Sequence, residues 1–184
     1  MRGRRAVFLD RDGTINVDKR YLYRAEDFEY LDGAVEGLRH LGDMGFILVL
    51  ITNQSGIARG YYSEDDYKKL DAWLKADLKS KGVTLEKSYF CPHHPSGTVP
   101  GYTRACECRK PKTGLFWKAA GELGIDMDRS YAIGDRMRDL SICGESGVKG
   151  FLITDTGEAE QDHIIHCPDW KSIVESIRTI EGSK

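Results

Sequence analysis

The chain alternates short apolar runs with amphipathic segments over most of its length. Apolar runs at 7–9, 46–51, 88–90, 131–133 and 150–153 are typical of buried strands. Apolar positions at helical spacing predict helices over 33–44, 63–82, 113–123, 136–145 and 168–180. Because strand and helix alternate almost throughout, we expect an α/β fold, a doubly wound (Rossmann-like) parallel sheet with helices on both faces.

One long segment does not fit this alternation. Residues 91–112 contain four prolines and little periodicity, and we interpret them as a loop. A loop of more than about 15 residues inside a compact domain is usually functional or held by something. The length of 184 residues suits one domain with an insertion, so we expect a single domain over 1–184 with this loop inserted. Of the helices, the second has the clearest start, with Ser63 as N-cap and Asp66 at N3.

Composition narrows the classes of function. A net charge of −2 argues against a general affinity for nucleic acid, and no apolar stretch is long enough to span a bilayer. The N-terminus lacks the apolar core of a secretory signal, and five cysteines then suggest the reducing cytoplasm. Cys143 and Cys167, expected in a helix and a loop, are interpreted as small buried hydrophobes.

Polar groups follow three of the predicted strands. Asp10-Arg11-Asp12-Gly13-Thr14 follows the first and Thr52 the second, while Asp135 follows a third, with Asp139 four residues on. Ligands of open α/β sheets bind beyond the carboxyl ends of the strands. We therefore expect these groups to meet at one place, where they would suit phosphoryl transfer.

Each carboxylate in the first segment has a candidate role. Asp10 is the candidate nucleophile, because a carboxylate can carry a phosphoryl group and divide hydrolysis into two easier steps. Asp12 is the candidate general acid and base. Gly13 permits a sharp turn and close approach to a phosphate, although Asp12-Gly13 alone also fits a plain turn.

A phosphate facing a carboxylate needs a counter-charge. Hard oxygen ligands select Mg²⁺, and we expect it to be bound by Asp10, Asp135 and the main-chain carbonyl of Asp12. Asp139 either orients a ligating water or a lysine, or is a solvated helix residue.

Further side chains are candidates for holding the phosphate oxygens. Thr52 directly follows a buried strand, and Lys110 lies between the long loop and a helix. Lys112 is the second choice for the lysine. Arg109 adds a guanidinium suited to two-pronged contact with an oxyanion.

The long loop carries a candidate zinc site. Cys91, His93, Cys106 and Cys108 form a Cys₃His set, which is typical of closed structural zinc sites. His94 is an alternative to His93, and free thiols are the alternative to a metal. A zinc ion here would be structural and would direct Arg109 and Lys110 toward the phosphate.

These motifs resemble those of the haloacid dehalogenase (HAD) superfamily of phosphatases. Asp10–Thr14 resembles its first motif, Thr52 its second, Lys110 its third, and Gly134-Asp135 with Asp139 its fourth. Within the superfamily, the chain from about residue 6 to 155 resembles the D-glycero-D-manno-heptose-1,7-bisphosphate 7-phosphatase family. That closer resemblance rests on the segments 15–18, 52–60, 91–95 and 106–111.

The resemblance implies a cytoplasmic, Mg²⁺-dependent, zinc-bearing enzyme without a large cap domain. It implies removal of the 7-phosphate to leave heptose 1-phosphate, on a route to lipopolysaccharide core or surface-layer glycans. Implied catalytic residues are Asp10, Asp12, Thr52 and Lys110. Implied Mg²⁺ ligands are Asp10, Asp12 and Asp135, and implied zinc ligands are Cys91, His93, Cys106 and Cys108. Implied substrate contacts are Asp18, Lys19, Arg20, Tyr21, Asn53, Gln54, Ser55 and Arg109.

The resemblance also shapes the expected site. Short loops around 15–32, 53–62 and 91–112 would cover it, and the partner would be a small phosphorylated sugar bound by a monomer. We hypothesise that a second phosphate on that sugar contacts basic side chains, namely Lys19, Arg20, Arg59 and Arg109.

Three other interpretations compete with this resemblance. Histidinol-phosphate phosphatases resemble the chain in the first motif and the zinc loop, but Ile57-Ala58-Arg59-Gly60 and Cys91-Pro92-His93-His94-Pro95 favour the heptose family. A non-catalytic binding module on the same scaffold predicts loss of Asp10 or Asp12, and both are present. A DNA-binding zinc module is disfavoured because no basic recognition helix follows the cysteines.

Overall fold

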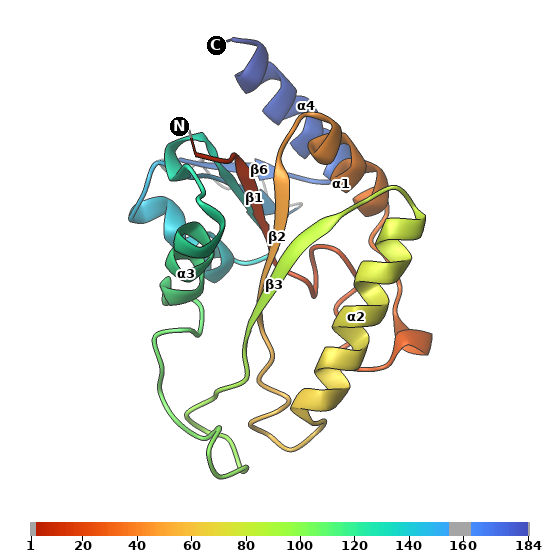
Figure 1. The fold of residues 1–184 in the computed structure, drawn as a ribbon, viewed down its shortest axis with the longest axis vertical. Coiled ribbons are helices and arrows are strands. Elements are labelled where there is room, and N and C mark those ends of the chain that lie inside the picture. Colours follow the sequence, from red (N-terminus) through yellow and green to blue (C-terminus); the bar gives the residue numbers. More distant parts are fainter. Residues whose placement is uncertain (1–2, 155–162, 184) are drawn as a thin grey trace.

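The fold is built on a six-stranded parallel sheet (Figure 1). The computed structural model describes residues 3–154 and 163–183. The strands, all parallel to their neighbours, lie in the order β3-β2-β1-β4-β5-β6. Their bounds are β1 (Ala6–Leu9), β2 (Ile47–Asn53), β3 (Leu85–Cys91), β4 (Tyr131–Gly134), β5 (Lys149–Ile153) and β6 (Ile164–Cys167). The chain starts near the centre and winds outward in both directions, so the order reverses between β1 and β4.

Helices cover both faces of this sheet (Figure 1). One face carries α1 (Ala34–Asp43), α2 (Glu64–Ser80) and α4 (Trp170–Gly182). The other carries α3 (Gly114–Leu123) and the 3-10 helix η3 (Met137–Gly144). Two further 3-10 turns are η1 (Ala25–Asp27) and η2 (Met127–Arg129). The predicted doubly wound α/β architecture is confirmed.

Side chains of β1 alternate between the two cores. Val7 and Leu9 pack on the side of α1 and α4, whereas Ala6 and Phe8 pack on the side of α3. This period-two alternation buries both faces of a central strand and explains its continuous apolar run. On the α4 side, the buried Trp170 donates from Nε1 to the carbonyl of Thr14 at 2.8 Å. The last helix thereby supports the turn that follows β1.

Most elements lie where the sequence predicts them. Ser63 caps α2 as expected: its hydroxyl accepts from the Asp66 N–H, and the Asp66 carboxylate accepts from the Ser63 N–H. The strand predicted at 88–90 is longer and spans Leu85–Cys91. The segment 136–145 is helical, but Met137–Gly144 forms a 3-10 helix. The sequence did not predict this type of helix, because eight residues of apolar spacing do not distinguish a period of 3.0 from one of 3.6.

One strand was missed. β6 reads Ile-Ile-His-Cys, and the four-residue run is too short and too polar at His166 to stand out. The placement of Cys167 in a loop was therefore wrong, since it ends β6; it is buried, as expected. Cys143 lies in η3 and is also buried.

Loops rather than a second domain surround the carboxyl edge of the sheet. Within 3–154 and 163–183, no large cap domain accompanies the sheet. The connection that joins β3 to α3 contains the cysteine segment. Among the described helices, none has both the length and the apolar character needed to cross a bilayer.

Candidate active site

The polar groups that follow the central strands meet at one edge of the sheet. Asp10 directly follows β1, Thr52 lies near the end of β2, and Asp135 directly follows β4. Because β1 pairs with both β2 and β4, these three strand ends are neighbours. The fourth group, Lys110, reaches the same place from the loop after β3.

Lys110 is the charged centre of this edge. Its ammonium lies 2.7 Å from Asp10 Oδ1 and 2.8 Å from Asp139 Oδ1, and it donates to the carbonyl of Ile51 at 2.7 Å. The side chain is only 1% exposed. Burial disfavours its charge, but the two carboxylates outweigh that effect and raise its pKa. The alternative, Lys112, is exposed and pairs with Glu107 at 3.7 Å, away from the site.

Three carboxylates gather at this edge of the sheet, and two of them, Asp10 and Asp139, contact the lysine. Asp10, Asp135 and Asp139 each offer an oxygen within 4.8 Å of the others. Burial, together with the Asp139 charge and against the pull of Lys110, raises the pKa of Asp10 to about 7. Burial and Asp139 likewise raise the pKa of Asp135 to about 6. One lysine does not neutralise three acids, so the cluster suits a further cation with hard oxygen ligands.

Gly13 allows this cluster to pack tightly. Its φ is +85°, and a Cβ there would collide with the Asp135 carboxylate. Only glycine therefore satisfies both the turn and the close approach.

Asp12 does not join the three carboxylates but is held by neighbouring donors. Arg11 contacts both carboxylate oxygens, at 3.0 and 2.9 Å from Nη2. Asn16 Nδ2 donates to Oδ1 at 3.1 Å, and Gln54 Nε2 approaches Oδ2 at 3.2 Å. Arg11 itself is buried and also donates to the carbonyl of Leu22. These contacts fix the direction in which Asp12 points.

Gln54 links Asp12 to the second strand end. Its Nε2 donates to Thr52 Oγ1 at 2.9 Å, and its Oε1 accepts from the Tyr62 hydroxyl at 2.6 Å. Sequence reasoning missed Arg11 and Tyr62 as parts of the site. Arg11 had a signal, a charged residue two positions after a buried strand, whereas Tyr62 had none.

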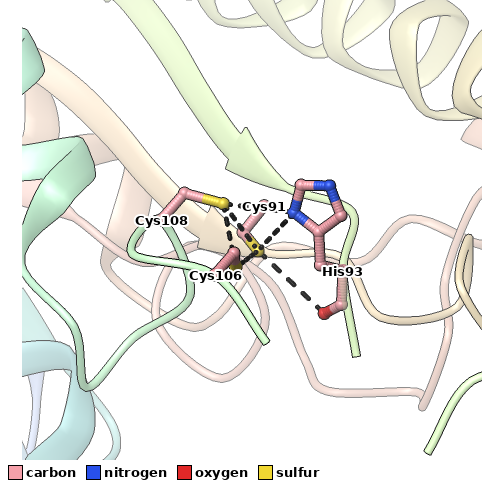
Figure 2. Close-up of side chains that lie close together, drawn as sticks. All are labelled: Cys91, His93, Cys106 and Cys108. Atoms are coloured by element: carbon pink, nitrogen blue, oxygen red, sulfur yellow. Dashed lines mark hydrogen bonds between the residues drawn. The ribbon is translucent and has the colours of Figure 1, made fainter. Parts of the chain in front are cut away.

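The four residues of the candidate zinc site converge, as Figure 2 shows. The sulfur of Cys108 lies 3.2 Å from the sulfurs of both Cys91 and Cys106, which are 3.5 Å apart. His93 Nδ1 lies 3.3 Å from the Cys108 sulfur and 3.7 Å from the Cys91 sulfur. A tetrahedron with zinc–sulfur bonds of about 2.3 Å has edges of about 3.8 Å, so this slightly tighter cluster fits that ion.

His94 faces a different environment. Its Nδ1 accepts from the Ser96 N–H at 3.0 Å, and its Nε2 lies 3.1 Å from Arg59 Nη2. The structure thus brings His93, and not its neighbour, to the three sulfurs.

A pocket of about 500 Å³ opens beside the strand ends. It is lined by Asp12 and by seven of the eight expected substrate contacts, namely Asp18, Arg20, Tyr21, Asn53, Gln54, Ser55 and Arg109. The eighth, Lys19, is not brought to the pocket and pairs with Glu29 at 2.9 Å. Lining residues that the sequence did not single out as substrate contacts are Tyr62, His94, Arg136 and Arg138, while Arg59 was expected only at a second phosphate.

The pocket is rich in guanidinium groups. Five arginines line it: Arg20, Arg59, Arg109, Arg136 and Arg138. Arg136 pairs with Asp18 at 3.3 Å, whereas Arg109 donates to the carbonyl of His93 at 3.3 Å. Burial lowers the pKa of Arg109, and the nearby charges of Arg138 and Arg59 add to this effect. Such a pocket favours an anionic ligand with more than one charged group.

Comparison with known proteins is consistent with this geometry. A family model described as HAD-hydrolase-like matches residues 107–180. A D-glycero-beta-D-manno-heptose-1,7-bisphosphate 7-phosphatase from Yersinia pestis is 44% identical over 168 residues, which cover 88% of this chain and 89% of that one. The enzyme of the same name from Haemophilus ducreyi is 46% identical over 158 residues, covering 85% and 86%.

Solved structures show a similar fold. The crystal structure of D,D-heptose 1,7-bisphosphate phosphatase from B. bronchiseptica, complexed with magnesium and phosphate, superposes with a TM-score of 0.78. The two chains are 26% identical, and the match covers 95% of this chain and 98% of that one.

Proposed function

The chain belongs to the D-glycero-D-manno-heptose-1,7-bisphosphate 7-phosphatase family of HAD hydrolases, and on this premise we propose that it removes the 7-phosphate of that sugar bisphosphate. The products are heptose 1-phosphate and inorganic phosphate. One observation carries the proposal: Asp10, Lys110, Asp135 and Asp139 gather at the strand ends beside an arginine-rich pocket.

In the first half of the reaction, a carboxylate oxygen of Asp10 attacks phosphorus. The new oxygen–phosphorus bond forms as the bond from phosphorus to the sugar oxygen breaks. Asp12 gives its proton to the departing sugar oxygen. Lys110 and Thr52 stabilise the charge that develops on the phosphoryl oxygens; Lys110 already lies 2.7 Å from Asp10.

In the second half, Asp12 takes a proton from water as the water oxygen attacks the aspartyl phosphate. The bond between Asp10 and phosphorus breaks, and inorganic phosphate leaves. Arg11 supports both halves because it contacts both oxygens of Asp12 and fixes the carboxylate's direction.

The acidic cluster fits Mg²⁺, since its three carboxylates outnumber the single lysine. We propose Asp10, Asp135 and the main-chain carbonyl of Asp12 as the ligands. When bound, Mg²⁺ supplies the positive charge that lets a phosphate dianion approach the Asp10 carboxylate. Asp139 is assigned to Lys110, which it contacts at 2.8 Å.

The Cys91, His93, Cys106 and Cys108 cluster fits zinc by donor set and by spacing. Four protein ligands leave no open position, so the proposed role is structural. The cluster holds the loop whose next two residues, Arg109 and Lys110, face the pocket and Asp10.

The arginines of the pocket support a second phosphate on the substrate. Arg20, Arg59 and Arg109 line the pocket, and we propose that they bind the phosphate on C1 while the 7-phosphate meets Asp10. Lys19 is left out of this set because it pairs with Glu29. The sugar between the two phosphates contacts Asp18, Tyr21, Gln54 and Ser55, which line the same pocket.

An assay of Arg109→Ala tests this orientation. The variant should raise KM for the bisphosphate by about tenfold or more while leaving KM for p-nitrophenyl phosphate nearly unchanged. Equal effects on the two esters would remove Arg109 from the second-phosphate site.

A substrate panel tests the overall assignment. Wild-type protein with Mg²⁺ is expected to release phosphate from the heptose bisphosphate far faster than from histidinol phosphate, which carries a single phosphate and a cationic amine. Faster turnover of histidinol phosphate would replace our proposal by that alternative. Including both anomers of the bisphosphate in the panel determines which one the pocket prefers.

The remaining features of the proposal concern the whole chain. We propose one domain over 1–184, of which residues 1–2, 155–162 and 184 lie outside the described part. We also propose a monomer acting in the cytoplasm, where the free thiols of the loop would stay reduced and able to bind zinc.

A further inference from the structure

The side chain of Asn53 forms two hydrogen bonds with the main chain of Lys110. Asn53 Nδ2 donates to the Lys110 carbonyl at 3.0 Å, and the Lys110 N–H donates to Asn53 Oδ1 at 3.0 Å. The two residues are 57 positions apart in the chain. Because a donor and an acceptor are engaged together, the pair fixes the orientation of residue 110 as well as its distance from β2.

The other end of the cysteine loop is attached at the same place. Cys91 is the ladder partner of Asn53 in the β2–β3 pair, and the Gln54 N–H donates to the Cys91 carbonyl at 2.8 Å. Residues 91 to 110 therefore leave from and return to the same end of β2. At the return, the main chain of Lys110 is held by the side chain of Asn53.

Strand β2 binds both the main chain and the side-chain ammonium of Lys110. The carbonyl of Ile51 accepts from the Lys110 ammonium at 2.7 Å, and Asn53, two residues later, holds the main chain. We propose that Asn53 is a positioning residue that sets the reach of the Lys110 ammonium to Asp10. This role rests on the proposed phosphatase function and deepens it.

The role differs from the sugar contact expected from the sequence. Asn53 lines the pocket, but its amide oxygen and one of its N–H groups are engaged by Lys110. Aspartate at this position would keep the acceptor for the Lys110 N–H but would set a carboxylate oxygen against the Lys110 carbonyl. Alanine would leave both main-chain groups of Lys110 without these partners.

The experiment compares two esters of different size in Asn53→Ala. One is the heptose bisphosphate, and the other is p-nitrophenyl phosphate, which has no sugar. Displacing a catalytic group by about 1 Å can cost about 100-fold, so we expect kcat to fall by about 10- to 100-fold on both esters. KM for the bisphosphate should change by less than about threefold.

A matched control removes a different hydrogen bond from the same loop. Thr103 donates from Oγ1 to the Val99 carbonyl at 2.9 Å and is exposed. Thr103→Val should therefore retain wild-type kcat on both esters. Zinc content and thermal midpoint are measured for every variant, so that loss of the loop structure is separated from misplacement of Lys110.

A double-mutant cycle tests whether Asn53 acts through Lys110. In a Lys110→Met background, adding Asn53→Ala should lower the residual kcat by less than about twofold. If Asn53→Ala loses zinc or fails to fold, Asn53→Asp decides, because it keeps the shape and the acceptor for the Lys110 N–H but replaces the donor with a charged oxygen that faces the Lys110 carbonyl.

Three results would overturn the assignment. A rise in KM for the bisphosphate with unchanged turnover of p-nitrophenyl phosphate would make Asn53 a sugar contact. Wild-type kinetics would make the two hydrogen bonds dispensable, and a full additional loss in the Lys110→Met background would separate Asn53 from the lysine. If wild-type protein hydrolyses the small ester but not the bisphosphate, the proposed substrate fails, while the small ester still tests Asn53.

Discussion

Lys110 and Asp10 are one hundred residues apart in the chain, and the Lys110 ammonium lies 2.7 Å from Asp10 Oδ1. Asp10 lies at the end of β1, and Lys110 lies near the end of the loop that follows β3. Lys110 also contacts Asp139, so its ammonium lies between two nearly fully buried carboxylates. In the proposed mechanism this contact serves both catalysis and stability, so its removal tests both.

Lys110→Met should impair both properties. We expect kcat to fall by about 100-fold or more, because the developing charge on the phosphoryl group loses the lysine cation proposed to stabilise it. Without metal, the two carboxylates lose their partner, which typically costs about 3–5 kcal/mol of the free energy of unfolding. Steady-state kinetics and urea unfolding measure the two effects. Lys112→Met, at an exposed lysine, should change stability by less than about 0.5 kcal/mol and leave kcat unchanged.

Asp10→Asn and Asp12→Asn should fail at different steps. The amide at position 10 cannot form an acyl phosphate, so turnover should fall by at least about 1,000-fold and no phosphorylated protein should form. Asp12→Asn should still be phosphorylated by p-nitrophenyl phosphate, whose leaving group needs little help from an acid, but should release phosphate slowly. Intact-protein mass spectrometry after rapid acid quench distinguishes the two variants. Phosphorylation of the Asp10→Asn protein would place the nucleophile elsewhere.

Asp135→Asn should stabilise the metal-free protein at alkaline pH. The folded pKa of Asp135 is raised to about 6, above the value of about 3.9 for an unfolded chain. The folded state therefore holds the proton more tightly, and stability is lost as pH rises from about 4 through 6. At pH 8 in a chelator, the variant should exceed wild type by on the order of 1–3 kcal/mol, and the difference should vanish near pH 4.

Adding Mg²⁺ should reverse that order. Wild type gains stability in proportion to its affinity for the ion, whereas a variant lacking a ligand gains little. Urea unfolding at several pH values measures the stability of wild type and of Asp135→Asn, each with and without Mg²⁺. A variant that responds to Mg²⁺ as strongly as wild type would exclude Asp135 from the metal site.

Removing zinc should lower turnover without touching a catalytic group. Cys106→Ser removes one of the four proposed zinc ligands. Residues 91–110 would then lose the metal that links them, and the position of Lys110 would be less restricted. We expect less than one zinc per chain, a lower thermal midpoint, and a fall in kcat of about tenfold or more. Cys143→Ala, at a buried cysteine outside the cluster, should keep a full equivalent of zinc. Wild-type kcat in zinc-free protein would separate the cluster from catalysis.

The sequence predicted the central part of the fold because each central strand is an unbroken apolar run followed by polar residues. β1, β2 and β4 could be found in this way, and their carboxyl ends meet as expected. β6 could not, since a four-residue edge strand containing His166 carries little periodic signal. The winding of η3 also escaped, because its apolar spacing fits more than one helical period.

Within the site, residue types predicted which side chains lie close together but not which of them form hydrogen bonds or ion pairs with one another. The pattern of cysteines predicted that Cys91, His93, Cys106 and Cys108 would converge, and the strand ends predicted the same for Asp10 and Asp135. Nothing in the sequence linked Tyr62 to Gln54 or Asn53 to the main chain of Lys110, because both contacts depend on how loops fold back. The sequence favoured Lys19 as a phosphate-binding residue, but in the structure Lys19 pairs with Glu29.

The absence of a large cap among residues 3–154 and 163–183 has a consequence for the rate of product release. A site walled by loops exchanges its contents without swinging one rigid body over another. Departure of the product should then depend on exposed side chains that line the pocket, such as Tyr21, which is 41% exposed. Solvent viscosity should slow such an enzyme only through diffusion of the sugar itself.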